Sequence, residues 1–275
     1  MGFADLHLHT FHSDGIRSPA EVVRLAAEHG LETIAITDHD NLAAFPEAEG
    51  LARAQGITLI PGVELSITWS GIDVHLLAYA FDPGNERLRA KLEACRDTRE
   101  RRGEIMVERL RDLGIPIDLA RVRELCGEGA LGRPHIARAL VEAGTVSTID
   151  EAFDRFLSPG GAGWVEKERL ELDEAIDIVR RAGGLTSLAH PTLYPDGEQV
   201  LRALIPLGID GVEILHPDVG PDAREAFRAI AAEHGLIATG GSDDHGFDGA
   251  ATFGSVKVPL GLVQPILDRW LGRAR

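Results

Sequence analysis

Histidine and carboxylate residues gather in four short segments of this sequence, each at the end of an apolar run. The segments are residues 5–15, 37–40, 188–191 and 241–245. Two of them place metal-ligand residue types two positions apart, His7 with His9 and Asp243 with His245. Because a β-strand points alternate side chains to one face, each pair can converge on one point. Imidazoles and carboxylates gathered from several strand ends predict a site for more than one divalent metal ion.

The composition limits the classes of partner. The chain has 275 residues, 44% of them hydrophobic and 26% charged, which suits one large domain or one domain with an insertion. A formal net charge of −16 argues against a duplex nucleic acid partner, although metal ions would still allow a small anionic substrate. No apolar stretch approaches the roughly 20 residues of a membrane span, and no secretory signal is evident. Since Cys95 and Cys126 form no CxxC motif, we expect a cytoplasmic protein; its oligomeric state stays open.

Seven apolar segments predict β-strands that alternate with helices. Several of them follow a glycine and a leucine or isoleucine, as in Gly30-Leu31 and Gly184-Leu185, which is typical of the loop from a helix into a buried strand. Ser18-Pro19-Ala20-Glu21 predicts a helix start with a capping box. This alternation suits a β/α barrel or a doubly wound sheet. The predicted strands are residues 4–9, 33–38, 58–66, 73–80, 185–190, 209–215 and 236–241.

The metal-type residues favour the barrel. They come from the ends of nearly every predicted strand, at or just beyond the carboxyl ends, and only a closed sheet brings so many strand ends around one mouth. Residues 84–165 break the alternation, and we expect a helical insertion folded over the mouth, whose charge run at 86–112 is a solvated helix face. The sequence thus predicts an irregular α/β barrel in two parts, residues 1–83 and 166–275, with residues 84–165 as a helical lid.

Six motifs follow one another through nearly the whole chain. They are His7-x-His9 with Ser13-Asp14-Gly15, Thr37-Asp38-His39-Asp40, Gly62-Val63-Glu64, His75, Ala189-His190-Pro191 and Gly241-Ser242-Asp243-x-His245. Their order resembles that of the PHP (polymerase and histidinol phosphatase) phosphoesterase family. One such motif would be weak evidence, but six in sequence are highly specific. The resemblance implies a distorted (β/α)7 barrel with up to three metal ions.

The resemblance also implies three groups of ligands. The first metal ion would be held by His7, His9, Glu64 and Asp243. The second would be held by Asp14, His39 and His245, and the third by His75 and His190 with Glu64 as a bridge. We expect manganese, with iron or zinc as alternatives, because imidazoles suit all three ions and carboxylates favour the harder ones.

Residues outside the ligand set are candidates for substrate contacts. Arg133 and His135 begin a predicted helix, where a guanidinium fork and backbone N–H groups can hold a phosphate. His216 ends the predicted strand 209–215 and is a candidate phosphate contact or proton donor, and Lys167 is a further phosphate candidate. Each of the four also has an ordinary structural or surface explanation.

Four more polar residues lie beside the motifs. Asp38, Asp40 and Asp244 directly flank ligands; they either orient imidazoles or support turns, and the sequence leaves both possibilities open. His12 lies in the loop between His9 and Asp14, and we expect its side chain to be solvated.

These features together predict an enzyme that hydrolyses a phosphate ester, with a metal-bridging hydroxide as the nucleophile. Arg133 and His216 would be its catalytic residues beside the metal ions. Within the family, the Gly132-Arg133-Pro134-His135 segment resembles nucleoside 3′,5′-bisphosphate phosphatases and related 5′-to-3′ exoribonucleases, so a small phosphorylated nucleotide is the expected substrate. The alternatives are exonuclease action on short RNA, a histidinol-phosphate phosphatase, an editing module that acts with a polymerase, and a metal-dependent binding module without catalysis.

Overall fold

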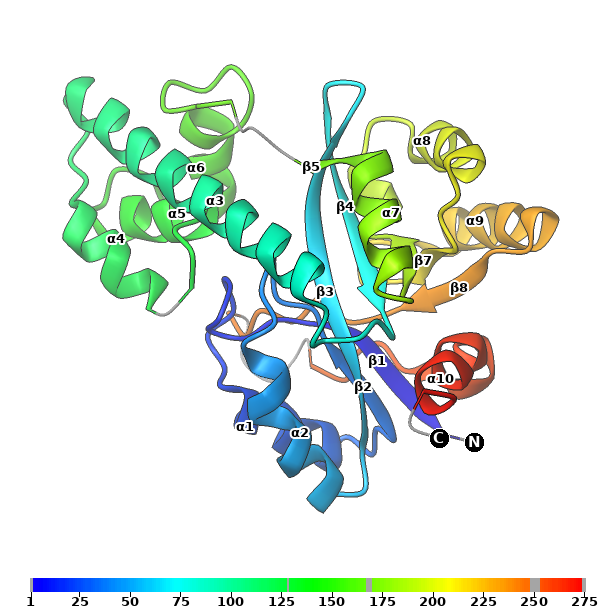
Figure 1. Ribbon diagram of the computed structural model, residues 1–275. Helices are drawn as coiled ribbons and strands as arrows, with labels where there is room; N and C mark the ends of the chain where they lie inside the picture. Colours follow the sequence, from blue (N-terminus) through cyan, green and yellow to red (C-terminus); the bar gives the residue numbers. More distant parts are fainter. Residues whose placement is uncertain (1, 128, 167–169, 248–252, 274–275) are drawn as a thin grey trace.

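One mixed sheet organises the molecule (Figure 1). The computed structural model describes residues 2–127, 129–166, 170–247 and 253–273. In these residues the sheet has nine strands: eight follow the order β8-β7-β6-β4-β3-β2-β1-β9, and the short β5 lies off this path and pairs with β3. The strands are β1 (Phe3–Leu8), β2 (Thr33–Ile36), β3 (Thr58–Trp69), β4 (Ile72–Tyr79), β5 (Leu170–Glu171), β6 (Leu185–Leu188), β7 (Gly211–Leu215), β8 (Ile237–Gly240) and β9 (Val258–Pro259).

The sheet closes almost completely into a barrel. The backbone N–H of His9 donates to the carbonyl of Asp244 over 3.1 Å, and that of Asp243 donates to the carbonyl of His7 over 2.9 Å. These bonds join the end of β1 to the segment that follows β8. Gly241 permits the approach, because a Cβ there would lie 2.4 Å from the backbone nitrogen of His7. The distorted barrel that the sequence predicts is therefore confirmed.

The directions of the strands correct the prediction that every candidate ligand lies at the carboxyl end of its strand. β1, β2 and β3 run parallel to one another, and so do β6, β7 and β8, but β4 runs antiparallel to both β3 and β6. β3 and β4 form a long hairpin whose turn residues, Ser70 and Gly71, both have positive φ, as hairpin turns require. His75 therefore lies near the start of its strand and not at a carboxyl end, and Glu64 lies inside β3. Hydrophobic periodicity cannot reveal strand direction, so the predicted placement of His75 was wrong. Glu64 was misplaced because β3 continues to Trp69, beyond the predicted strand 58–66.

Helices cover the outside of the barrel. α1 begins at the predicted capping box of Ser18 and Glu21, with Pro19 in its first turn. Buried residues of α7, α8 and α9 belong to the same apolar core as β3, β4 and β7, whereas α1 and α2 share a second core with β1 and β2. The helices are α1 (Pro19–Glu28), α2 (Ala44–Ala54), α3 (Glu86–Asp112), α4 (Leu119–Cys126), α5 (Arg133–Glu142), α6 (Ile149–Ala152), α7 (Leu172–Arg181), α8 (Gly197–Leu204), α9 (Pro221–His234) and α10 (Gln264–Leu271).

The helix α3 joins the barrel to a group of helices beside it (Figure 1). Leu88 and Leu92, in its first half, pack in the barrel core, whereas Met106 and Leu110 share a separate core with α4, α5 and α6. After α6 the chain continues into a π-helical turn at Phe153–Leu157. Although α3 has 27 residues, none of the described helices is long and apolar enough to cross a membrane.

Candidate metal centre

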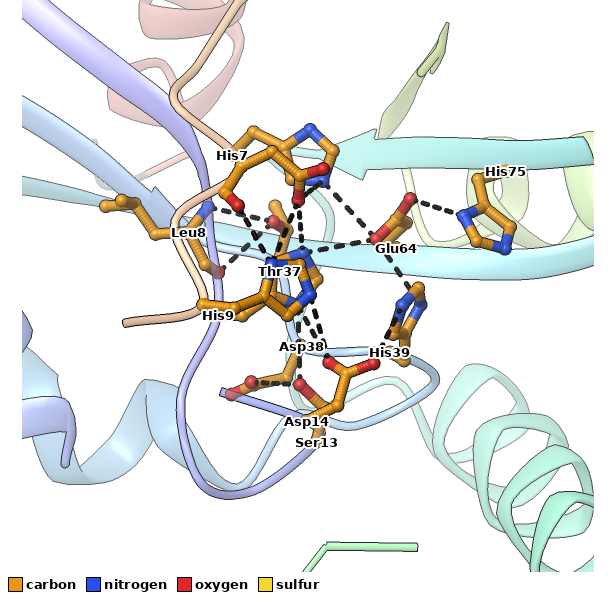
Figure 2. A network of polar contacts seen from close by, with 12 residues as sticks. His7, Leu8, His9, Ser13, Asp14, Thr37, Asp38, His39, Glu64 and His75 are labelled. Atoms are coloured by element: carbon orange, nitrogen blue, oxygen red, sulfur yellow. Dashed lines mark hydrogen bonds and ion pairs between the residues drawn. The ribbon is translucent and has the colours of Figure 1, made fainter. Parts of the chain in front are cut away.

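The predicted ligands converge around Glu64; Figure 2 shows His7, His9, His39 and His75 beside its carboxylate. β1 supplies His7, and His9 directly follows its last residue; the apolar cores take the neighbouring Leu6 and Leu8. Glu64 Oε2 lies 3.3 Å from His7 Nε2, 3.3 Å from His9 Nε2 and 3.3 Å from His39 Nδ1. Glu64 Oε1 lies 2.8 Å from His75 Nδ1 and 3.0 Å from His190 Nε2. One buried carboxylate thus faces five imidazoles.

Two aspartates complete the arrangement. Asp243 Oδ1 lies 3.2 Å from His7 Nε2 and 3.1 Å from His9 Nε2. Asp14 Oδ1 lies 3.3 Å from His245 Nε2, and its Oδ2 lies 3.5 Å from His39 Nε2. Three sets have ligand atoms within 4.8 Å of one another: His7, His9, Glu64 and Asp243; His9, Asp14, His39 and His245; and His39, Glu64 and His75. The structure therefore brings together all nine residues that the sequence singled out.

Buried atoms without hydrogen-bond partners show that these donors fit a metal cluster. Among the described residues, several such atoms point into the space between the ligands, although each is shielded from water. They are His7 Nε2, His9 Nε2, Asp14 Oδ1, His39 Nδ1 and Asp243 Oδ1. Leaving a buried polar atom unpaired costs free energy, and proteins rarely do so without a ligand. Divalent cations would satisfy all five atoms at once.

The electrostatics of the site divide the histidine ligands into two groups, with the pKa lowered for His39 and His75 and raised for His7, His9 and His245. Burial opposes ionisation of Glu64, but the imidazoles of His39 and His75 hold the pKa of Glu64 well below its usual value. Burial lowers the pKa of His39 and of His75 below the ordinary value for histidine. Burial acts in the same direction on His7 and His9, but the carboxylates of Asp243 and Glu64 outweigh it and raise the pKa of both rings. Ionised carboxylates and neutral imidazoles are the forms that coordinate divalent ions, so metal binding would displace protons from the histidines whose pKa is raised.

A buried glutamate behind the cluster was missed in the sequence. Glu213 is fully buried on β7, and its Oε1 lies 3.1 Å from His7 Nδ1, the ring nitrogen that faces away from the cluster. Its Oε2 accepts the backbone N–H of His190 over 2.8 Å. On the other side of His190, the Tyr194 hydroxyl lies 3.2 Å from the Nδ1 atom. A carboxylate in the apolar run of 211–215 was the signal that could have revealed Glu213.

The aspartates that flank the ligands support loops. Asp38 accepts the backbone N–H of Thr10 over 2.7 Å and the hydroxyl of Ser13 over 2.6 Å, and so fixes the loop that presents Asp14. Asp40 accepts the backbone N–H of Ser66 and pairs with Arg99, and Asp244 pairs with Arg17. These contacts favour the turn-supporting alternative that the sequence left open.

The prediction of a solvated His12 was wrong. Only 4% of His12 is exposed, and its Nε2 lies 2.9 Å from Glu47 Oε1 on α2. Its neighbours in sequence gave no sign of this contact, because Glu47 is distant along the chain.

A cavity of about 250 Å³ opens beside the cluster. Its walls include His39, Glu64, His75 and His245, and three arginines also line it. Arg133, the predicted phosphate residue, is one of them; the others are Arg99 and Arg102, on α3. The prediction that the charge run of this helix is a solvated face therefore fails at Arg99 and Arg102. Spacing by three residues places Arg99 and Arg102 near each other on the helix surface, but only packing decides which way that surface turns.

The other predicted substrate contacts have different surroundings. His135 is buried in the first turn of α5, where its Nδ1 accepts the backbone N–H of Gly132 over 3.1 Å. His216 is 2% exposed, with its Nε2 3.4 Å from Asp243 Oδ2 and its Nδ1 accepting the backbone N–H of Asp218. This geometry suits a role in positioning Asp243. Phosphate contacts by His135 and His216 stay predictions, and Lys167 lies outside the described residues.

Comparisons with known proteins place this geometry in a family. A model of the PHP domain matches residues 5–115. A 5′-3′ exoribonuclease of Haemophilus influenzae is 34% identical over 270 residues, which cover 97% of each protein. A 3′,5′-nucleoside bisphosphate phosphatase of Chromobacterium violaceum is 33% identical over 258 residues, covering 89% of this chain and 88% of that protein. The chain belongs to the PHP family.

A solved structure supports the assignment of this chain to the PHP family. The crystal structure of a Bifidobacterium adolescentis protein described as a metal-dependent phosphoesterase has a TM-score of 0.88 and 35% identity, and the match covers 97% of this chain and 96% of that one. The family and the cluster of histidines and carboxylates together make this PHP protein a metal-dependent hydrolase of phosphate esters.

Proposed function

We propose that this PHP phosphoesterase removes one phosphate from a small nucleotide that carries two, of the nucleoside 3′,5′-bisphosphate type. The observation that carries the proposal is the cavity in which three arginines and the metal-type ligands line the same small space. The arginines suit one phosphate and the metal-type ligands suit another, so the cavity as a whole suits a ligand with two phosphates. The Chromobacterium violaceum relative, named for this substrate class, supports the same choice.

The three arginines are arranged as an anion site would be. The guanidinium of Arg102 lies 4.6 Å from the Trp164 ring, and Arg133 lies 5.4 Å from the same ring. Burial and the nearby charges of Arg133 and Arg99 lower the pKa of Arg102 to about 10. Arg102 Nη2 is buried and has no hydrogen-bond partner among the described residues. Because a bound phosphate would relieve both the repulsion and the unpaired donor, we assign the phosphate that is not cleaved to this group.

The ligands would hold up to three divalent ions, and manganese is the expected metal. Such ions supply Lewis acidity, which activates water and neutralises charge on the phosphoryl oxygens. Glu64 and Asp243 hold the cluster together, since each faces more than one imidazole. Arg133, backed by Asp73 at 3.8 Å, holds the substrate so that the other phosphate reaches the cluster. His216 keeps Asp243 in place, and the donor of the leaving-group proton is His216 or water.

The arginines also separate this proposal from the histidinol-phosphate alternative. Histidinol phosphate carries cationic groups, which three guanidinium groups in one cavity would repel. A site for that substrate would need carboxylates on the wall that faces the cluster. The wall does include Asp73, but Arg133 pairs with it.

The test is a comparison of substrates on the manganese-loaded protein. Phosphate release is measured from adenosine 3′,5′-bisphosphate, adenosine 5′-monophosphate and histidinol phosphate. We expect the bisphosphate to have the highest kcat/KM, by at least about tenfold, because only it engages both parts of the cavity. Equal turnover of the mono- and bisphosphate, or a preference for histidinol phosphate, would overturn the proposal.

A further inference from the structure

Tyr194 contacts both histidines of the third predicted ligand group. Its hydroxyl accepts the backbone N–H of His75 over 3.0 Å and lies 3.2 Å from Nδ1 of His190. His75 comes from β4, and His190 follows β6. Their ring atoms, Nδ1 of His75 and Nε2 of His190, lie 2.8 Å and 3.0 Å from the same Oε1 atom of Glu64. One hydroxyl therefore contacts both residues, and one carboxylate oxygen faces both rings.

The backbone N–H of His75 needs this hydroxyl because the ladder between β4 and β6 ends there. The N–H of Ala189 donates to the carbonyl of His75 over 3.1 Å. In a regular antiparallel pair, the N–H of His75 would donate back to the carbonyl of Ala189. The chain turns away at His190 instead, and the Tyr194 hydroxyl accepts the N–H. The hydroxyl thus takes the place of a strand carbonyl beside a metal ligand.

The backbone of His190 is held in an unusual conformation. Its φ is 28°, in the left-handed region that residues other than glycine adopt where their surroundings enforce it. Its N–H donates to Glu213, and the 3-10 turn Pro191–Leu193 then brings Tyr194 beside its ring. Tyr194 is 9% exposed and belongs to the apolar core of β3, β4 and β7. Because the core fixes the phenol ring, its hydroxyl can restrain His190.

The hydroxyl also suits the tautomer that His190 needs. A neutral imidazole carries its proton on one nitrogen and coordinates metal through the other. Nε2 of His190 is the atom that faces Glu64, so coordination there requires the proton on Nδ1. A phenol oxygen has two lone pairs, which can accept this N–H and the backbone N–H of His75 together. Phenylalanine at position 194 would accept neither.

We propose that Tyr194 is a positioning residue for the third metal ion, which it serves by fixing His75 and His190 through one hydroxyl. The inference rests on the metal centre of the proposed function and adds a residue that sets how tightly one of its ions is held. Tyr194 acts through the ligands and is not one itself, because its oxygen lies against Nδ1 of His190, whereas Nε2 faces Glu64.

The contacts of Tyr194 differ from those of the other buried partner of His190. Glu213 contacts the ring of His7 and the backbone of His190, so it spans the first and third ligand groups. Both hydrogen-bond contacts of the Tyr194 hydroxyl are with residues of the third group. Loss of this hydroxyl should therefore weaken one ion and leave the others in place.

The experiment measures metal binding by the Tyr194→Phe variant, which keeps the ring in the core and loses only the hydroxyl. Chelator-treated protein is titrated with Mn²⁺, and the EPR signal of free Mn²⁺ gives the amount bound. Wild type should bind about three ions per chain; in the variant the dissociation constant of one should rise about 10- to 100-fold, with the others within about threefold of wild type. The titration contains no substrate, so its outcome does not depend on which phosphate ester the enzyme cleaves.

Tyr79→Phe is the matched control, because the chain has two tyrosines. The Tyr79 hydroxyl is also buried, and it donates to the carbonyl of Leu6 over 2.9 Å. This variant should keep wild-type affinity for every ion, and the Tm of both metal-free variants shows whether each one folds. A purely structural role for Tyr194 would lower Tm without singling out one ion.

Three results would overturn the inference. The first is a Tyr194→Phe variant with unchanged dissociation constants, and the second is one in which all ions weaken equally. The third is a wild-type protein that binds at most two ions, which would remove the third ligand group. In each case phosphate release from the nucleoside bisphosphate still tests the proposed function separately.

Discussion

Nδ1 of His7 lies 3.1 Å from Oε1 of Glu213, and both side chains are fully buried. The hydrogen bond fixes the His7 ring so that Nε2 faces the cluster, where Glu64 and Asp243 lie. The other oxygen of Glu213 holds the backbone of His190. One carboxylate on β7 therefore positions two ligands that are far apart in the sequence, and partners of this kind tune metal affinity.

We expect Glu213→Gln to weaken metal binding by about 10- to 100-fold, because a glutamine has one acceptor oxygen for two donors. Metal content after dialysis against a weak chelator measures the effect, and activity at saturating manganese should recover in part. Glu225→Gln, on the exposed surface of α9, is the matched control. Wild-type metal retention in Glu213→Gln would show that Glu213 does not position the ligands.

Removal of metal should abolish activity and lower stability together. The site contains three carboxylates and six imidazoles, and several of their buried atoms have no hydrogen-bond partner among the described residues. Without metal, these unpaired atoms lower the stability of the folded protein. We expect a strong chelator to reduce phosphate release by more than about 100-fold and to lower Tm by several degrees, since a ligand stabilises the state that binds it. Added manganese should restore both. A chelated protein with full activity would rule out a metal-dependent reaction.

Arg133→Ala should act on one class of substrate. Loss of a charged, partly buried hydrogen bond to the second phosphate predicts a fall of about 10- to 100-fold in kcat/KM for adenosine 3′,5′-bisphosphate. For p-nitrophenyl phosphate, which has no second phosphate, the change should stay within about threefold. Arg155→Ala, an exposed arginine that pairs with Glu151, serves as the control. If both substrates lose activity equally, Arg133 has no selective role.

The stability of the protein should depend on pH through His135. Burial lowers the pKa of His135 to about 4, from an ordinary value of 6.5. The folded state therefore favours the neutral ring, and this contribution is complete above pH 6.5 and is lost as the pH falls towards 4. The difference amounts to about 3 kcal/mol.

The His135→Gln variant isolates this effect. Its side chain can still accept the Gly132 N–H, as the third helical residue does in a capping box, but it does not titrate. Urea unfolding of chelator-treated protein at pH 7.5 and pH 5 gives the free energy of unfolding. We expect the variant to lose less stability than wild type between the two pH values, whereas the exposed His234→Gln should behave as wild type. Equal losses in all three proteins would contradict the assignment.

Much of this protein is determined by local sequence. The apolar segments end where polar ligands begin, and spacing by two on a strand is enough to pair His7 with His9. The capping box at Ser18 fixes the start of α1 through contacts within one turn. The order of the motifs identified the family because ligand types at fixed positions are needed for the chemistry, whatever packs around them.

Other features of the site depend on which distant segments of the chain meet, so only the tertiary structure decided them. The reversed direction of β4, which brings His75 to the rim, follows from strand pairing and leaves no mark in periodicity. Glu213 is a lone carboxylate in an apolar strand until the barrel closes and places it behind His7. Arg99 and Arg102 belong to a charged helix whose orientation only packing against the barrel could set. Sequence therefore supplied the ligands, and long-range packing decided what surrounds them.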